Sequence, residues 1–251
     1  MSKTVLITGA TSGIGHATAL AFAKAGYDLL VCARRLEVLE NMKAEFEPEY
    51  GIKVTPFALD VTDRKAVSEI LPAVIEKAGG VDILVNNAGL AQGLDPFQES
   101  SIDDIELMIN TNVKGLLYVS RTVLPFMLAK NAGHIINLGS TAGIYAYAKG
   151  AVYCATKAAV KTLSDGIRID TIESDIKVTT IQPGIVETPF SEVRFHGDKE
   201  KAAVYAGVEA LQAEDIAEII VFAATQPKRV QISDITIMAN QQATGFMIAK
   251  K

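Results

Sequence analysis

Two tyrosines near the middle of the chain each have a lysine four residues further on. Tyr145 precedes Lys149, and Tyr153 precedes Lys157. Residues four apart on a helix share a face, so the lysine ammonium can lie close to the phenol. A free phenol titrates at about pH 10, and a nearby cation favours the phenolate and lowers that pKa. One of these pairs is therefore a candidate general acid and base.

The surrounding sequence separates the two pairs. Tyr145 lies in IYAYAKG, a segment bounded by glycines that predicts a loop without fixed helical spacing. Tyr153 lies in AVYCATKAAVKTL, whose alanines and other helix formers predict a helix. Residues 107–164 contain no Asp or Glu, so no local carboxylate neutralises Lys157. We therefore expect Tyr153 to be the working phenol.

A glycine-rich segment, TGATSGIG at residues 8–15, follows the first apolar run of the chain. Its glycines let the backbone turn sharply and approach a ligand without a Cβ in the way. The helix expected to follow offers free N–H groups and a partial positive charge to a phosphate. This context favours a dinucleotide site, and a simple tight turn between strand and helix is the alternative.

The residues after the second apolar run bear on which dinucleotide would bind. An acidic residue there would favour the free ribose hydroxyl of NAD. This chain has Arg34 and Arg35 instead, with no acid before Glu37. Two guanidinium groups suit the 2′-phosphate of NADP, which they can bind through paired hydrogen bonds. The alternative is that both arginines are a solvated start of a helix.

Short β-branched runs alternate with longer segments of helical period along the whole chain. The runs expected to form strands are 4–8, 28–33, 53–59, 82–87, 134–138, 177–182 and 234–239. The expected helices are 13–25, 36–47, 63–78, 101–129, 151–173 and 213–226. This alternation predicts an α/β fold: one doubly wound domain, residues 1–251, with a seven-stranded parallel sheet and helices on both faces.

Residues 187–211 interrupt this alternation. The segment mixes Phe190, Phe195 and Tyr205 with several charged residues. Long loops in compact domains are usually functional lids or unstructured segments. We expect a lid that closes over the site, and a plain surface insertion is the alternative.

Composition narrows the kinds of function. The net charge of −5 argues against a nucleic-acid partner, and no apolar run is long enough to cross a membrane. The first apolar run passes directly into the glycine-rich segment, so we expect no signal peptide. Cys32 and Cys154 lie in apolar surroundings, which favours a reduced, cytoplasmic protein. The three histidines lack the spacing of zinc ligands, so we expect no metal site.

Several motifs occur together in the order of a known family. Ser140 stands 13 residues before Tyr153, and the other motifs are Thr8–Gly15, the NNAG of Asn86–Gly89, Asn112 in NTNVKG, the YxxxK from Tyr153 to Lys157, and Pro183–Gly184. From Lys3 to about Ala239 the chain resembles the short-chain dehydrogenase/reductase family. The resemblance implies a Rossmann-type domain and an enzyme that transfers a hydride between a nicotinamide cofactor and a CH–OH group.

The resemblance also implies roles for individual residues. Tyr153 would exchange a proton with the substrate oxygen, and Ser140 would hydrogen-bond that oxygen. Lys157 would lower the tyrosine pKa and bind the nicotinamide ribose, while Asn112 would support a water linking Lys157 to solvent. Expected cofactor contacts, with Asp60 at the adenine and Thr188 at the nicotinamide amide, are Gly9, Thr11, Ser12, Gly13, Ile14, Gly15, Arg34, Arg35, Asp60, Val61, Asn87, Ala88, Gly89, Tyr153, Lys157, Pro183, Gly184, Val186 and Thr188. Taken singly, three of these residues have structural alternatives: a strand-end cap for Ser140, a mid-helix polar residue for Asn112 and a cap of the third helix for Asp60.

The subgroup that the chain resembles is that of NADP-dependent 3-hydroxy acid (serine) dehydrogenases. NNAGLAQG, GHIINLGSTAG and FSEVRFHGD carry this resemblance. It implies a small hydroxy-acid or carbonyl substrate, contacted by Ser140, Tyr153 and Arg194. Arg194 is a candidate partner for the substrate carboxylate, against the alternative of a surface ion pair with Glu192 or Asp198, and Gln92 is left unplaced.

Two other functions stay open at this point. A 3-oxoacyl thioester reductase, or another carbonyl reductase of the family, would share every catalytic motif. That reductase usually ends in a Gly-Gly-containing strand, whereas this chain ends in DITIMANQQATGF. A non-enzymatic NADP sensor is the other alternative, although such proteins commonly lose the Tyr or the Lys.

Two of the expected helices are apolar on more than one side. Residues 151–167 and 101–129 are rich in Ala, Leu, Val and Met around much of the helix. Such a helix must bury a second face, within the domain or against another subunit. In the family these helices form a seam between subunits, so the resemblance implies a homotetramer or a dimer.

Overall fold

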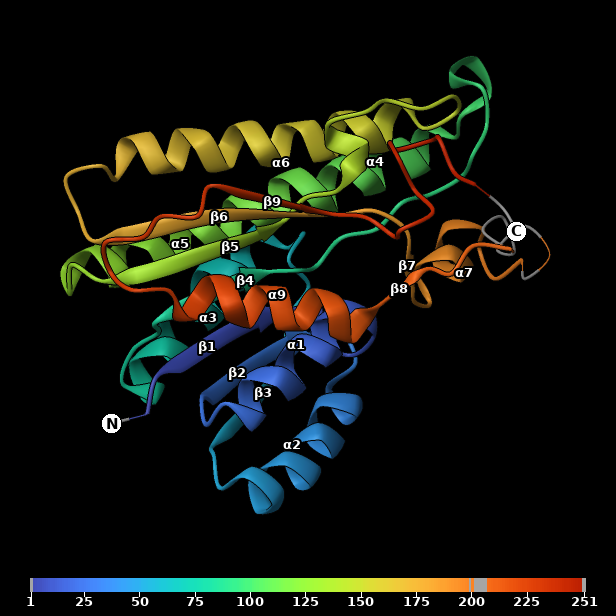
Figure 1. Ribbon diagram of the computed structural model, residues 1–251. Helices are drawn as coiled ribbons and strands as arrows, with labels where there is room; N and C mark the ends of the chain where they lie inside the picture. Colours follow the sequence, from blue (N-terminus) through green and yellow to red (C-terminus); the bar gives the residue numbers. More distant parts are fainter. Residues whose placement is uncertain (1, 199, 201–206, 250–251) are drawn as a thin grey trace.

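The computed structural model describes residues 2–198, 200 and 207–249 as a three-layer α/β domain (Figure 1). Its main sheet has seven parallel strands in the order β3-β2-β1-β4-β5-β6-β9. The strands are β1 (Thr4–Thr8), β2 (Asp28–Ala33), β3 (Val54–Ala58), β4 (Ile83–Asn86), β5 (Gly133–Leu138), β6 (Ile176–Pro183) and β9 (Asp234–Ile237). The seven-stranded parallel sheet predicted from the sequence is therefore confirmed.

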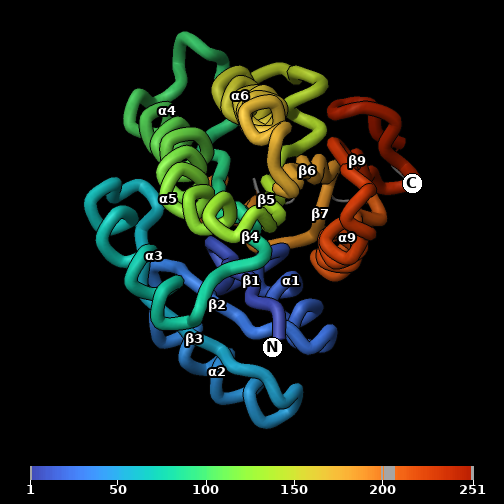
Figure 2. Tube along the Cα trace, turned by 90° about the vertical axis from the view of Figure 1, so that its left-hand side faces the viewer, coloured from blue at the N-terminus to red at the C-terminus, as the bar shows by residue number. Residues whose placement is uncertain are grey.

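Helices cover both faces of this sheet (Figure 2). On one face α1 (Gly13–Lys24) and α9 (Ala213–Thr225) pack against each other, beside α2 (Leu36–Tyr50). The other face carries α3 (Arg64–Ala78), α4 (Ile102–Ile109), α5 (Leu116–Ala129) and α6 (Ala151–Asp170). Because both faces are covered, a central strand such as β1 is buried along its whole length, which explains its continuous apolar run.

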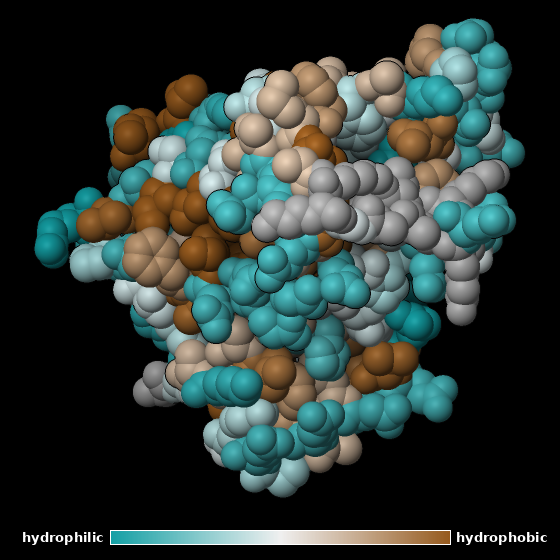
Figure 3. All heavy atoms as spheres, turned by 45° about the vertical axis from the view of Figure 1, so that its right-hand side comes forward, coloured by the Kyte–Doolittle hydropathy of each residue, from teal (hydrophilic) through white to brown (hydrophobic). Residues whose placement is uncertain are grey.

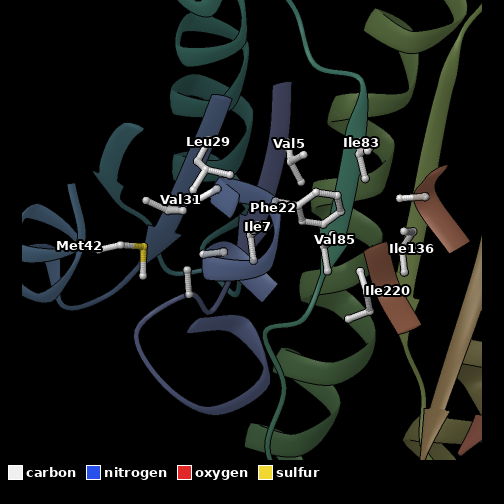
Figure 4. Packing of buried hydrophobic residues seen from close by; sticks show 14 of the residues in the cluster. Val5, Ile7, Phe22, Leu29, Val31, Met42, Ile83, Val85, Ile136 and Ile220 are labelled. Atoms are coloured by element: carbon white, nitrogen blue, oxygen red, sulfur yellow. The ribbon is translucent and has the colours of Figure 1, made fainter. Parts of the chain in front are cut away.

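The core consists of two apolar layers, one on each side of the sheet. On the α1 side Phe22 is fully buried among strand side chains such as Val5 and Val85 (Figure 4). The opposite layer joins β-strand residues to the apolar sides of α3 and α5. These two layers bury both faces of the sheet, and the loops of the candidate site begin at the ends of its strands.

The prediction of one continuous helix over residues 101–129 is wrong in detail. The structure has α4, then a π-helical turn η2 (Asn110–Gly115), and then α5. A Cβ built on Gly115 would lie 2.7 Å from the Cγ2 of Val61, so glycine lets this turn approach the neighbouring loop. Such π turns often occur at functional sites, and this one carries Asn112.

The segment predicted as a lid, residues 187–211, is structured where it is described. β7 (Val186–Glu187) pairs with β8 (Leu211–Gln212) in a small separate sheet, and α7 (Phe190–Arg194) follows β7. All three lie at one end of the molecule, at the right of Figure 1. Residues 199 and 201–206, including Tyr205, lie outside the described residues. The two-stranded sheet was not predicted from the sequence.

The surface of the molecule is mixed in character. Figure 3 shows one face on which hydrophilic side chains are interspersed with apolar groups. Large exposed apolar side chains include Phe97, Ile102, Ile169, Ile172, Phe222 and Phe246. Within the described part of the chain, none of the helices has the length and apolar character needed to cross a membrane.

Candidate active site

All seven strands of the main sheet run in the same direction, so their carboxyl ends lie at one edge. The loop after β1 carries Gly9, the loop after β4 carries Asn87, and the loop after β5 carries Ser140. β1 has β2 on one side and β4 on the other, which makes this edge a point where the strand order reverses. Open α/β sheets bind ligands in the crevice at such a point.

The glycine-rich turn between β1 and α1 has the shape that a phosphate group needs. Gly9 and Gly13 adopt positive φ angles of 67° and 53°, which L side chains rarely tolerate. A Cβ built on Gly15 would lie 2.3 Å from the carbonyl oxygen of Gly9. Ser12 begins α1 without a side-chain hydrogen bond to the first turn. The N–H groups of that turn can therefore be offered to an anion, and the residues fit a dinucleotide pyrophosphate.

Asn87 and Thr8 hold this turn against the end of β4. The Thr8 hydroxyl accepts hydrogen bonds from the backbone N–H groups of Asn87 (3.1 Å) and Ala88 (3.0 Å). The side-chain amide of Asn87 donates to the carbonyl oxygens of Thr8 (3.0 Å) and Gly9 (3.1 Å). Two loops that are almost eighty residues apart in sequence therefore form one wall of the crevice.

The two arginines after β2 are both exposed at this edge. An Nη of Arg35 donates to the hydroxyl of Thr11 in the glycine-rich turn, 2.9 Å away. Arg35 therefore lies above the turn, where the adenosine half of a dinucleotide would be placed. The alternative interpretation, that the arginines form the solvated start of a helix, also fits, because α2 begins directly after Arg35.

Asp60 does not cap the third helix. Its carboxylate accepts from the backbone N–H (2.9 Å) and the hydroxyl (2.8 Å) of Thr62, forming a local turn. The cap of α3 is Asp63, which accepts from the N–H groups of Lys65 and Ala66. The alternative considered for Asp60 is therefore wrong, and this residue shapes the loop after β3.

Tyr153 and Lys157 both lie on α6, as their spacing predicts, and both are buried. The Nζ of Lys157 lies 5.9 Å from the centre of the Tyr153 ring and donates to the carbonyl oxygen of Leu138, 2.8 Å away. Lys157 is only 7% exposed, and burial lowers its pKa to about 8. The other pair lies in the loop before α6, where Lys149 has a positive φ angle.

Asn112 lies in the π-helical turn and faces the loop after β4. Its amide donates to the carbonyl oxygen of Leu90 (2.7 Å) and to the hydroxyl of Thr156 (3.1 Å), and its Oδ1 accepts from the N–H of Leu90 (2.8 Å). A Cβ built on Gly89 would lie 3.2 Å from this Oδ1 and 3.5 Å from the Nζ of Lys157. Asn112 and Lys157 therefore both lie next to Gly89.

Ser140 lies where β5 and β6 end. Its hydroxyl accepts from the N–H of Ala142 (3.1 Å) and donates to the carbonyl oxygen of Pro183 (3.4 Å). It caps the short turn η3 (Thr141–Gly143), so the structural alternative for this residue is also realised. On the next loop Thr188 lies close to the start of α1, since a Cβ built on Gly13 would be 3.2 Å from the Cβ of Thr188.

Arg194 is buried, with 4% of its surface exposed, so the alternative of a surface ion pair is wrong. Its Nε donates to the carbonyl oxygen of Gly93 (2.9 Å), and one Nη donates to the hydroxyl of Tyr147 (3.1 Å). The N–H of Gly93 donates in return to the carbonyl oxygen of Arg194 (2.9 Å). The guanidinium carbon lies 6.0 Å from the centre of the Tyr153 ring. The structure thus places a cation beside the expected catalytic phenol.

Tyr153, Arg194 and Gly93 line one pocket, together with Gln92 from the segment after β4 and Met108 from α4. With its amide oriented to satisfy its hydrogen bonds, Gln92 donates to the carbonyl oxygens of Val193 (3.0 Å) and Arg194 (3.2 Å). His196 lies 3.2 Å from the carboxylate of Asp104, a residue of α4 that also lines the pocket. The hydrogen bonds of Gln92 and Gly93 therefore connect α7 to the segment after β4, and His196 connects the residues after α7 to α4.

Sequence reasoning missed Tyr147 and Gly93. Tyr147 lies in the loop before α6, among residues without periodicity, and it is half-buried against Arg194. Its separation of 47 residues from Arg194 leaves no local pattern that could have found the contact. No group of three or more His, Cys, Asp or Glu suited to a metal ion occurs among the residues that the structure describes.

Comparisons with known proteins agree with this arrangement. The family model described as short chain dehydrogenase matches residues 3–199. The chain is 43% identical to an NADP-dependent 3-hydroxy acid dehydrogenase of Schizosaccharomyces pombe, over 99% of this chain and 97% of that protein. It is 45% identical to the NADP-dependent 3-hydroxy acid dehydrogenase YdfG of Salmonella typhi, over 95% and 96%.

Among solved structures, the closed form of a serine dehydrogenase complexed with NADP+ superposes with a TM-score of 0.91 and 41% identity, covering 99% of both chains. Serine dehydrogenase from Escherichia coli gives a TM-score of 0.82 and 39% identity, covering 96% of this chain and 99% of that one. The matched model spans most of the chain and includes Ser140, Tyr153 and Lys157. The chain therefore belongs to the short-chain dehydrogenase family and is an oxidoreductase.

Proposed function

We propose that this protein is an NADP-dependent dehydrogenase of 3-hydroxy acids. It oxidises the hydroxyl of compounds such as serine or 3-hydroxypropionate, or reduces the matching semialdehyde. The observation that carries this proposal is the buried guanidinium of Arg194, 6.0 Å from the ring of Tyr153 in one pocket. A carboxylate on the cation and a hydroxyl on the phenol are the two ends of a small hydroxy acid.

The choice of NADP rests on the groups at the adenosine end. Arg34 and Arg35 are exposed after β2, where they can bind the 2′-phosphate, and the glycine-rich turn receives the pyrophosphate. The names of the similar dehydrogenases agree with this choice. NADP, when bound, supplies the nicotinamide ring that accepts or donates the hydride.

The proton is moved by residues of the chain. Tyr153 takes the proton of the substrate hydroxyl in oxidation and returns it in reduction, while the hydroxyl of Ser140 hydrogen-bonds the same oxygen. The buried ammonium of Lys157 favours the phenolate form of Tyr153. Asn112 fixes the loop after β4 through its hydrogen bonds with Leu90. We propose that it also supports a water that connects Lys157 to solvent.

The carboxylate is bound by Arg194. A guanidinium has five N–H donors. One donates to Gly93 and one to the hydroxyl of Tyr147, which together fix the plane of the group. A bidentate pair with a carboxylate then needs only the remaining N–H groups of the two Nη atoms of the guanidinium. We also propose that the described part of residues 187–211 acts as a lid, with Arg194 on it.

The assembly and location of the protein are part of the same proposal. Mostly apolar side chains of α4, η2 and α6, with Phe97 from the segment before α4, line a surface hollow; those of the three helices are Ile105, Ile109, Val113, Ala151, Val152, Ala155 and Thr156. A second copy of the chain packed against these helices would cover this hollow. We therefore propose a cytoplasmic homotetramer or dimer, built from single-domain subunits.

Initial rates with the purified protein test the proposal. NADP and NAD are compared on L-serine, 3-hydroxypropionate and 3-hydroxyisobutyrate, with reduction of a carrier-bound 3-oxoacyl thioester measured alongside. Turnover of the hydroxy acids with NADP is the expected result. Turnover of the thioester alone would make the protein a 3-oxoacyl reductase. Tight NADP binding without turnover of any alcohol or carbonyl would make it a sensor.

A further inference from the structure

The chain continues beyond the last strand of the sheet and returns to the carboxyl edge. Figure 1 shows this dark-red segment beside β7 and β8. It contains the sequence NQQATGF, and its two glutamines, Gln241 and Gln242, have no part in the proposed chemistry. Gln242 is only 5% exposed, and its Oε1 accepts a hydrogen bond from the backbone N–H of Ile185, 2.9 Å away. A polar side chain so deeply buried is held there by its hydrogen bonds.

Gln242 also lies unusually close to the neighbouring glycine. A Cβ built on Gly184 would lie 2.1 Å from the Oε1 of Gln242 and 2.9 Å from its amide carbon. Gly184 is the second residue of the Pro183–Gly184 motif, and its N–H donates to the carbonyl oxygen of Ile237 at 2.7 Å. The glycine in this motif therefore makes room for the glutamine side chain.

The tail that carries Gln242 is itself fixed. The backbone N–H of Gln242 donates to the carbonyl oxygen of Ala239 (2.8 Å), and Gln242 forms an antiparallel bridge with Ile248. The preceding residue, Gln241, accepts from the N–H of Glu209 at 2.7 Å. Ile185 precedes β7 and Glu209 precedes β8. Two consecutive glutamines therefore bind backbone N–H groups near the two ends of the segment that we propose as a lid.

In the turn after β6, hydrogen bonds fix both backbone polar groups of Ile185. Its N–H is bound by Gln242, and its carbonyl oxygen accepts from the N–H of Leu211 at 3.0 Å. Three residues further along, Thr188 lies against the start of α1 at Gly13. Because only the short strand β7 separates Ile185 from Thr188, we expect a shift at Ile185 to move Thr188.

We propose that Gln242 is a positioning residue that fixes the turn from Pro183 to Thr188 where the nicotinamide half of the cofactor binds. This inference rests on the proposed function for the identity of the cofactor. In this role Gln242 needs no contact with the cofactor or the substrate. It acts through the backbone of Gly184 and Ile185, which then presents Thr188 to the nicotinamide amide.

Two ligands of different length separate this role from a merely structural one. NADPH spans the whole site, whereas adenosine 2′,5′-bisphosphate reaches only the end near Arg34 and Arg35. Gln242→Met has a similar length but lacks the acceptor, so the N–H of Ile185 loses its partner. We expect the dissociation constant of NADPH to rise about tenfold, the scale of one unmade buried hydrogen bond, while that of the bisphosphate stays unchanged.

Gln231→Met is the matched control. Gln231 also holds backbone groups of β6, accepting from the N–H of Val178 (3.2 Å) and donating to its carbonyl oxygen (2.8 Å). These contacts lie near the opposite end of the strand. We expect this variant to lower the Tm without changing the binding of either ligand.

Equal weakening of both ligands by Gln242→Met, or a lower Tm with both constants unchanged, would overturn the proposal. If Gln242→Met does not fold, Gln242→Asn serves instead, since it keeps the amide but withdraws it by one methylene. That variant is expected to give a smaller loss confined to NADPH, and its absence would count against Gln242. A wild-type protein that bound neither ligand would refute the proposed cofactor site and not the positioning role.

Discussion

The glycine-rich turn at residues 8–15 and the pocket around Arg194 lie at the same edge of the sheet but are built differently. The turn presents backbone N–H groups from one short run of sequence, and its shape depends on where glycine occurs. The pocket depends on side chains, and its partners Gly93 and Arg194 are 101 residues apart. A site built from local backbone can serve any member of a family, whereas a site of distant side chains can change with the substrate.

The largest effect expected from this comparison concerns Tyr153, which lines the pocket around Arg194. Tyr153→Phe removes the proton carrier and should lower kcat by about a thousandfold, within the usual range for general acid–base catalysis. NADP binding, which depends on the backbone turn, should change little. Tyr145→Phe is the control, because Tyr145 lies in the loop before α6 and is 37% exposed. Steady-state kinetics check both variants, and a Tyr153→Phe enzyme with normal kcat would remove Tyr153 from the mechanism.

The second prediction concerns the two arginine side chains at the adenosine end of the proposed cofactor site. Replacing Arg34 and Arg35 together by Ala should reduce the preference for NADP over NAD by about a hundredfold, since each hydrogen bond to a charged group contributes about 1.5–3 kcal/mol. Arg229→Ala, an exposed arginine after α9, should change nothing. The ratio of kcat/KM for the two cofactors is measured. An unchanged ratio would assign these arginines to the solvated start of α2.

A third prediction concerns the free-energy cost of burying the charged side chain of Lys157. Its pKa is lowered to about 8 by burial, so the folded protein releases this proton at a lower pH than the unfolded chain does. The free energy of unfolding contributed by Lys157 should therefore rise with pH above 8, by about 1.4 kcal/mol between pH 7 and pH 9. Urea unfolding of wild type and Lys157→Met at both pH values measures this. A difference between the two proteins that does not vary with pH would contradict the burial of a charged lysine.

The smallest predicted effect belongs to Tyr147, which we expect to act on the substrate through its hydrogen bond with Arg194. Tyr147→Phe removes one hydrogen bond to the guanidinium and should raise the KM for 3-hydroxypropionate about three- to tenfold. The KM for 1,3-propanediol, which has no carboxylate, should stay the same. Tyr145→Phe again serves as the control from the same loop. Equal changes for both substrates would show that Tyr147 supports the pocket without acting through Arg194.

The same contrast explains how much of the molecule the sequence could predict. The seven strands, the glycine-rich turn and the Tyr153–Lys157 pair follow from local patterns, and the structure has them in the expected places. The π-helical turn at Asn110–Gly115 does not follow, because it depends on the close approach of Gly115 to Val61. Periodicity within a helix carries no information about such a contact.

The substrate end was predictable only in part. Arg194 was identified by resemblance, but its burial and its bonds to Gly93 and Tyr147 depend on α7 and two loops meeting in space. The bond from Ile185 to Gln242 joins residues 57 apart, and no motif connects them. Long-range hydrogen bonds between loops are the part of this fold that only the structure supplies.

The central claim is that Arg194 binds the substrate carboxylate beside Tyr153. The most direct test is kcat/KM for 3-hydroxypropionate and for 1,3-propanediol, measured with NADP on wild type and Arg194→Ala. We expect Arg194→Ala to lose about a hundredfold on the acid, the scale of a charged hydrogen-bonded pair, and less than about threefold on the diol. Equal losses on the two substrates would contradict the account and leave Arg194 as a structural link between the lid and the loop after β4.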